Sequence, residues 1–141
     1  MATPTGFTGG HSFASAGNFE GCNTCHTGMS ATSPLLTSAT EDIETLLETL
    51  VTKINEAGDG HDILQKDPDD GHYHGYFDVY EGSNPTGYWK NPDFGAPAFP
   101  VLTNAQFGAI LNYQMVYRDG SMGVHNYPYI KKLLENSIAA I

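Results

Sequence analysis

The sequence predicts a small, mainly α-helical fold with much irregular loop, in which about three helices pack together and leave room for one short strand or hairpin. Two observations lead to this prediction. Three stretches repeat apolar residues at the spacing of one helical face, and 16 glycines with 8 prolines favour long irregular segments between them. A chain of 141 residues fits a single domain, spanning residues 1–141.

The first predicted helix covers residues 39–57. Ser38 with Glu41 makes a capping box at its start, and acidic residues in its first turns complement the helix dipole. Ala57-Gly58 ends it. Its apolar face consists of Ile43, Leu46, Leu47, Leu50, Val51 and Ile54.

Two further helices are predicted over residues 103–118 and 126–140. Thr103 with Gln106 makes a second capping box, and Asp119-Gly120 ends that helix. Asn126 is the expected N-cap of the last helix, whose tolerated first turn holds Pro128. The apolar residues are Phe107, Ile110, Leu111 and Met115 on the earlier helix and Ile130, Leu133, Leu134, Ile138 and Ile141 on the later one.

Two segments lack a helical period. Residues 1–21 are predicted as a Gly-rich arm, and residues 58–102 as a turn-rich loop region in which residues 76–80 are the one strand candidate. A loop of this length is uncommon in a compact domain unless it has a function or wraps something. We expect it to wrap the edge of a bound group or a neighbouring subunit.

The most informative motif is Cys22-Asn23-Thr24-Cys25-His26, which follows the arm. C-x-x-C-H is the attachment sequence of haem c, in which both thiols bond the porphyrin as thioethers and the histidine ligates the iron. Zinc, thioredoxin-like and disulfide interpretations are weaker, because the chain has only two cysteines and no strand pattern precedes Cys22. We expect one covalent haem c on a short helical turn over residues 22–29, with His26 as the proximal ligand in a small cytochrome c-like domain.

The residue on the other face of the iron would decide the chemistry. A second histidine gives a low-potential electron carrier, a methionine raises the potential, and an open position allows binding or catalysis. His125 is the first candidate, because it lies on a short Gly-containing turn between the last two predicted helices. His11 and Met122 are the alternatives. The other histidines and methionines considered are His61, His72, His74, Met29 and Met115.

The segment from Asp119 to Asn126, followed by Tyr129 and Leu133-Leu134, resembles the closing segment of multihaem c-type cytochromes of anaerobic respiration, which are related to the ammonia-forming nitrite reductases. The resemblance covers residues 103–141 and the haem motif. It implies that the flanking helices pack along the haem and that His125 is the distal ligand. This chain departs from the family in having one haem motif, in placing Tyr127 before Pro128, and in lacking the Lys-ligated motif of the catalytic haem.

A second group of candidate ligands lies in the loop region. His72 and His74 would point the same way on an extended chain and could serve a secondary metal or a neighbouring haem. Asp67, Asp69 and Asp70 offer oxygen ligands for calcium, although the full EF-hand spacing is missing. A solvated acidic turn is the alternative interpretation.

The chain carries 16 acidic and 6 basic residues, for a net charge of −10. This charge argues against nucleic acid as a partner and favours cationic partners. No apolar run is long enough to predict a membrane span. Because haem c is attached outside the cytoplasm, we expect a periplasmic or extracellular protein whose signal peptide is missing from this sequence.

These observations predict an electron carrier, a monohaem c-type cytochrome with a bis-histidine iron and no catalytic residues. Its expected partners are redox proteins, among them other cytochromes. Two alternatives stay open. One is a subunit of a homo-oligomer, an extracellular cytochrome filament or another multihaem assembly, and the other is a haem enzyme or gas sensor with an open sixth position.

Overall fold

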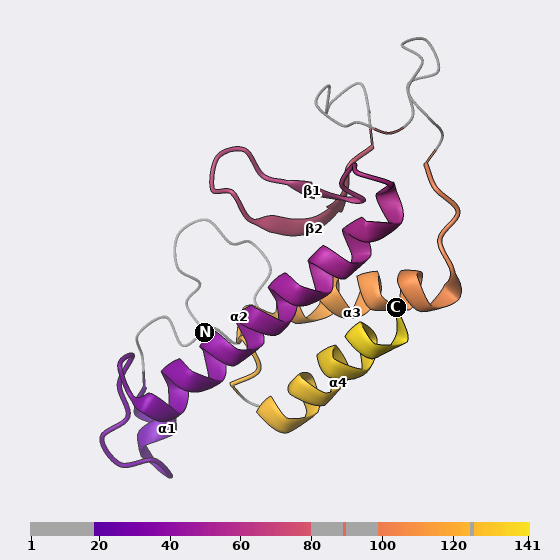
Figure 1. Ribbon diagram of the computed structural model, residues 1–141. Helices are drawn as coiled ribbons and strands as arrows, with labels where there is room; N and C mark the ends of the chain where they lie inside the picture. The colour runs from indigo at the N-terminus through magenta and orange to yellow at the C-terminus, as the bar shows by residue number, and fades with distance from the viewer. Residues whose placement is uncertain (1–18, 80–88, 90–98, 125) are drawn as a thin grey trace.

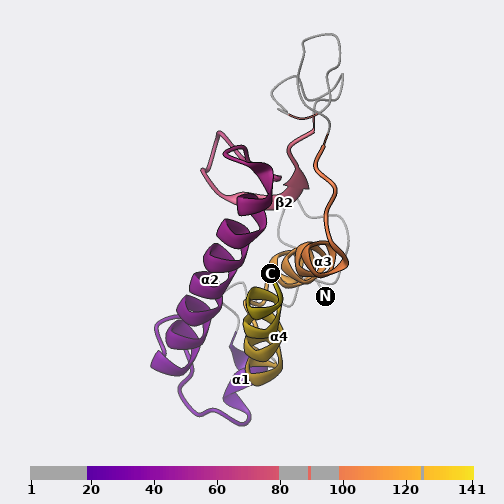
Figure 2. The ribbon, with the colours of Figure 1, turned by 45° about the vertical axis from the view of Figure 1, so that its right-hand side comes forward.

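Three long helices and a two-stranded antiparallel sheet form the fold in the computed structural model, which describes residues 19–79, 89, 99–124 and 126–141 (Figure 1). The helices are α1 (Glu20–Asn23), α2 (Pro34–Asn55), α3 (Asn104–Asp119) and α4 (Tyr127–Ala140), and a 3₁₀ turn (Glu56–Gly58) follows α2. The longest helix, α2, packs against both α3 and α4, which also pack against each other. Figures 1 and 2 show α4 alongside α2, with α3 running across them. The prediction of a mainly α-helical fold is confirmed.

The start of α2 differs from the prediction. The helix begins at Pro34 with Ser33 as its N-cap, so the predicted capping box of Ser38 and Glu41 lies inside the helix and is wrong. Proline is well suited to the first helical position, where its missing N–H leaves no hydrogen bond unmade and its fixed φ is already helical. Ser33 makes no side-chain cap; its hydroxyl accepts a hydrogen bond from the backbone N–H of Ser30 at 2.9 Å.

The ends of α3 are as predicted. The Thr103 hydroxyl accepts from the Gln106 backbone N–H, the Gln106 side chain accepts from the Thr103 backbone, and Gly120 ends the helix in the left-handed conformation. The predicted apolar face is wrong in part. Ile110 is buried, but Phe107, Leu111 and Met115 are about half exposed; the side chains buried beside Ile110 are Ala109, Tyr113 and Val116. The face of α3 that packs against α2, α4 and the sheet is therefore the one that carries these buried residues, and it differs from the predicted face.

The predicted loop region contains a hairpin of β1 (Leu64–Lys66) and β2 (Tyr73–Phe77). The single strand expected over residues 76–80 therefore starts earlier and has a partner. The hairpin docks on α3, where the Tyr113 hydroxyl donates to the Tyr73 carbonyl and the Gln114 amide donates to the Gly75 carbonyl, both at 2.5 Å. These two bonds satisfy carbonyls on the edge of the short sheet.

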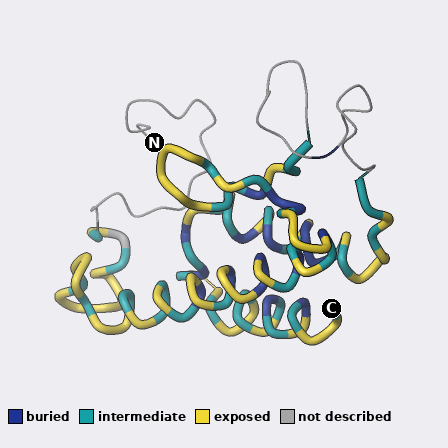
Figure 3. The backbone as a smooth tube through the Cα atoms, turned by 45° about the horizontal axis from the view of Figure 1, so that its top comes forward, coloured by how far each residue is buried: buried dark blue, intermediate teal, exposed yellow. Residues whose placement is uncertain are grey.

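The core lies where the three long helices meet the hairpin (Figure 3). Its fully buried side chains include Ile43, Leu50 and Ile54 of α2, Ile110 of α3 and Leu134 of α4. Asn126 precedes α4 as predicted, but its side chain makes no capping hydrogen bond. Within the described residues, none of the helices combines the length and the apolar character needed to cross a membrane. The predicted arm lies outside the described residues up to residue 18.

Candidate functional site

A pocket of about 710 Å³ is lined by the three residues of the predicted haem-attachment motif that would bond the haem. Cys22, Cys25 and His26 are among its lining residues. Others come from the first turns of α2 and from the chain entering α4, far along the sequence. The other lining residues are Met29, Leu35, Leu36, Ser38, Ala39, Val124 and Tyr127. This volume lies within the range of about 300–1,000 Å³ that is usual for pockets of small molecules and cofactors.

The motif forms a single tight turn. The Cys22 carbonyl accepts hydrogen bonds from the backbone N–H groups of Cys25, at 3.1 Å, and His26, at 2.8 Å. Such bonding brings residues three and four positions apart to one side of the backbone. Cys22, Cys25 and His26 therefore share the wall of the pocket, while Asn23 takes another role.

Asn23 closes the loop that follows the motif. Its side-chain oxygen accepts from the Met29 backbone N–H at 2.6 Å, and its amide donates to the Met29 carbonyl at 3.4 Å. Gly28 takes a positive φ of 78° inside this loop, a conformation that other residues rarely adopt. The variable position after the first cysteine thus holds the shape of the segment that carries His26.

The described residues that line the pocket carry no carboxylate, ammonium or guanidinium group. No aspartate, glutamate, lysine or arginine is among them, and most of their side chains are aliphatic or contain sulfur. Both cysteines are free, Cys25 being exposed and Cys22 partly buried. Two unpaired thiols, one imidazole and an uncharged wall match what covalent attachment of a porphyrin requires of the protein. The residues present therefore fit haem c.

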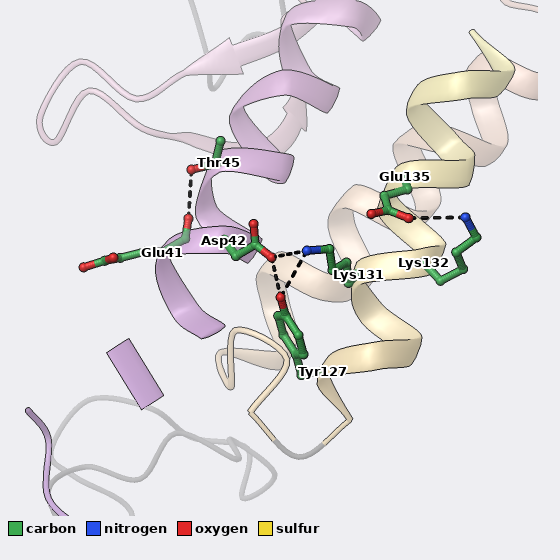
Figure 4. Close-up of polar contacts among 7 residues, drawn as sticks. All are labelled: Glu41, Asp42, Thr45, Tyr127, Lys131, Lys132 and Glu135. Carbon is green, nitrogen blue, oxygen red and sulfur yellow. Dashed lines mark hydrogen bonds and ion pairs between the residues drawn. The ribbon is translucent and has the colours of Figure 1, made fainter. Parts of the chain in front are cut away.

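Tyr127 connects the pocket to a polar cluster between α2 and α4 (Figure 4). Its hydroxyl donates to Asp42 of α2 and accepts from Lys131 of α4 at 3.2 Å, and the Lys131 ammonium lies 2.6 Å from the same Asp42 oxygen. Hydrogen bonds from Lys131 and Tyr127 hold the pKa of Asp42 below its ordinary value. The hydrogen bond with Asp42 raises the pKa of Lys131. The cluster ties the first turn of α4, and with it one wall of the pocket, to α2.

The predicted distal ligands can be located only in part. His125 and His11 lie outside the described residues. Val124, the chain neighbour of His125, lines the pocket, and Met29 is the one methionine among its described lining residues. Met122 packs partly buried against the hydrophobic core, and Met115 is exposed on α3.

The candidate calcium ligands lie in the turn between β1 and β2. Asp67, Asp70 and His74 come together there, with ligand atoms within 4.8 Å of one another. The His74 Nε2 lies 2.8 Å from Asp70 and its Nδ1 lies 3.7 Å from Asp67, so both ring nitrogens already face carboxylates. Asp69 is not part of the group; its backbone N–H donates to the Asp67 carboxylate. All three side chains are partly or largely exposed, as in a solvated acidic turn.

Comparison of this chain with family models, curated proteins and solved structures finds no match. The site therefore has to be interpreted from its own chemistry. Sequence reasoning missed the cluster of Asp42, Tyr127 and Lys131, because Asp42 is 85 positions from Tyr127 and belongs to another helix. The only local signal was the spacing of Tyr127 and Lys131, four residues apart on one helix.

Proposed function

We propose that this chain binds one covalent haem c through Cys22, Cys25 and His26 and serves as a monohaem electron-transfer protein. The observation that supports the proposal is that all three of these residues line one pocket together with uncharged residues of α2 and of the chain entering α4, among the residues that the structure describes. A bound haem c would supply one-electron redox chemistry. The protein's part is to attach the group and orient it.

The arrangement of the motif supports this assignment over a thiol function. The hydrogen bonds to the Cys22 carbonyl keep Cys22, Cys25 and His26 close together on one backbone turn, and all three line the pocket, as double thioether attachment with proximal ligation demands. The aliphatic side chains of Leu35, Leu36 and Ala39 offer van der Waals contact to a large apolar ring. A simple dithiol has no need of a pocket of this size.

His125 is our proposed distal ligand. It stands next to Val124 and two positions before Tyr127, both of which line the pocket. Two imidazole ligands would leave no open position at the iron, which favours electron transfer over binding or catalysis. We also infer a location outside the cytoplasm, because haem c is attached there, and cationic redox proteins as partners, because the chain carries a net charge of −10.

The test is an optical and EPR spectrum of the protein produced together with a haem c attachment system. We expect a low-spin six-coordinate spectrum that carbon monoxide does not readily change. Replacement of His26 or His125 by Ala should abolish this low-spin signal. The matched control is His61→Ala, because His61 lies against Trp89, with ring centroids 6.1 Å apart, and is absent from the pocket wall.

Each result bears on a separate part of the proposal. Failure of the wild-type protein to retain haem after denaturation would refute the attachment. A high-spin spectrum in the wild type would refute bis-histidine ligation and favour an open sixth position. An unchanged spectrum in His125→Ala would refute that residue as the distal ligand. Loss of the low-spin signal in His61→Ala to the same extent would show that the losses in the other histidine variants reflect misfolding of the chain and not loss of an iron ligand.

A further inference from the structure

A stripe of large apolar side chains on α3 faces solvent. Seven large apolar residues are exposed among the described residues, and three of them, Phe107, Leu111 and Met115, lie on this helix. They are four residues apart and about half exposed, at 50, 50 and 48%. Residues spaced by four form a continuous row along a helix. The fold buries the other side of α3, so the stripe has no partner among the described residues.

The charge distribution indicates what can cover this stripe. The chain has a net charge of −10, yet residues 94–117 contain no Asp, Glu, Lys or Arg. Two copies of an acidic protein repel each other over most of their surface, so they can approach closely where the surface is uncharged. Residues 104–117 of α3 offer a cationic partner no charge to pair with. The neutral stripe therefore fits a second copy of this chain better than an oppositely charged protein.

The spacing of the stripe is also self-complementary. Leu111 lies midway between Phe107 and Met115, four residues from each. In a pair of antiparallel helices related by a two-fold axis, Leu111 would meet its own equivalent and Phe107 would meet Met115 of the second copy. Such isologous contacts are the usual form of a homodimer interface.

Gly108 lies on the same face of α3 as the stripe, three residues before Leu111 and seven before Met115. It lies inside α3 next to Phe107, and a Cβ atom placed on it would meet no atom of the described residues within 4 Å. Packing among the described residues therefore does not require a glycine there, although glycine disfavours a helix interior. A missing side chain beside the stripe lets the backbone of a second helix come close.

We propose that the α3 stripe of Phe107, Leu111 and Met115 is the interface of a homodimer, with Leu111 at the two-fold axis. The proposal does not depend on haem. A single helix from each copy gives a small interface, so the dimer should dissociate on dilution.

Sedimentation velocity of the full chain over a dilution series tests the proposal. The wild type should shift from dimer toward monomer as it is diluted, and Leu111→Asp should weaken dimerisation at least about tenfold, because it places two like charges at the axis. Val101→Asp is the matched control; it adds the same charge at a residue that is 98% exposed and outside α3, and it should leave the dimer intact. Leu111→Met keeps an apolar side chain and should also preserve the dimer.

Two results would overturn the proposal. The first is a wild type that is monomeric at every concentration; if that monomer also binds uncharged lipid vesicles through Leu111, the stripe would be assigned to a membrane surface. The second is an equal loss of dimer in Leu111→Asp and Val101→Asp, which would indicate a general effect of charge. Circular dichroism of each variant establishes that the fold is retained.

Discussion

Gly75 connects the hairpin to α3, and its replacement by alanine should destabilise the protein. Gly75 has a φ of 80°, and a Cβ atom there would lie 2.9 Å from the Gln114 Cγ. The left-handed backbone costs a residue with a side chain about 1–2 kcal/mol. Relief of the contact requires Gln114 to move, which breaks its 2.5 Å hydrogen bond to the Gly75 carbonyl at about 0.5–1.5 kcal/mol. The lower entropy of the unfolded alanine chain returns about 0.4–1 kcal/mol.

The net loss for Gly75→Ala is thus about 0.5–3 kcal/mol of unfolding free energy. Urea unfolding followed by circular dichroism measures it, and a loss of 2 kcal/mol would lower the midpoint by about 1 M. Gly60→Ala is the control, because Gly60 also has a positive φ of 94° but has nothing within 4 Å of its Cβ position. Its loss should be about 0–1.6 kcal/mol, smaller than that of Gly75→Ala by the free energy of the broken hydrogen bond. Equal losses in the two variants would refute the predicted contact between the hairpin and α3.

Three further predictions concern the core, the polar cluster and α3. Leu134 is fully buried, so Leu134→Ala should lower the free energy of unfolding by about 2–5 kcal/mol, measured by urea unfolding; a loss below 1 kcal/mol would place Leu134 outside the core. Because the pKa of Asp42 is lowered on folding, the stability it contributes is present above its ordinary pKa of 3.8 and is lost as the pH falls through its folded pKa. The stability gap between wild type and Asp42→Asn should therefore be constant near neutral pH and shrink in acid unfolding below pH 3.8; a gap that is unchanged there would contradict the cluster. Gly108→Ala should raise the stability of the monomer by about 0.5–1 kcal/mol at high dilution, and a loss would show that α3 needs glycine at this position.

The helices were predictable because each combines an apolar period with a local end signal. The cap at Thr103 and Gln106 and the stop at Gly120 depend on neighbouring residues only, and both predictions were correct. The start of α2 was ambiguous, since proline either breaks a helix or begins one. Ser38 was expected as the N-cap because Glu41 follows it at the spacing of a capping box, but the helix begins at Pro34.

Long-range contacts account for the remaining differences. The periodicity of α3 predicts an apolar face but does not tell which side of the helix the hairpin and the other helices will cover. Phe107 was therefore placed on the packed face, whereas in the structure it is half exposed. The short strand β1 carries too few residues to show a period. The motif from Cys22 to His26 was evident, whereas its proximity to Tyr127 depends on α4 folding back along α2.

The most direct test of the proposed function is mass analysis of the protein produced with a haem c attachment system. We predict that the denatured protein retains the mass of one haem and that peptide mapping locates it on the segment containing Cys22 and Cys25. Replacement of both cysteines by serine should remove it. A purified wild-type chain with the bare polypeptide mass and two thiols open to alkylation would contradict the account, whatever its fold.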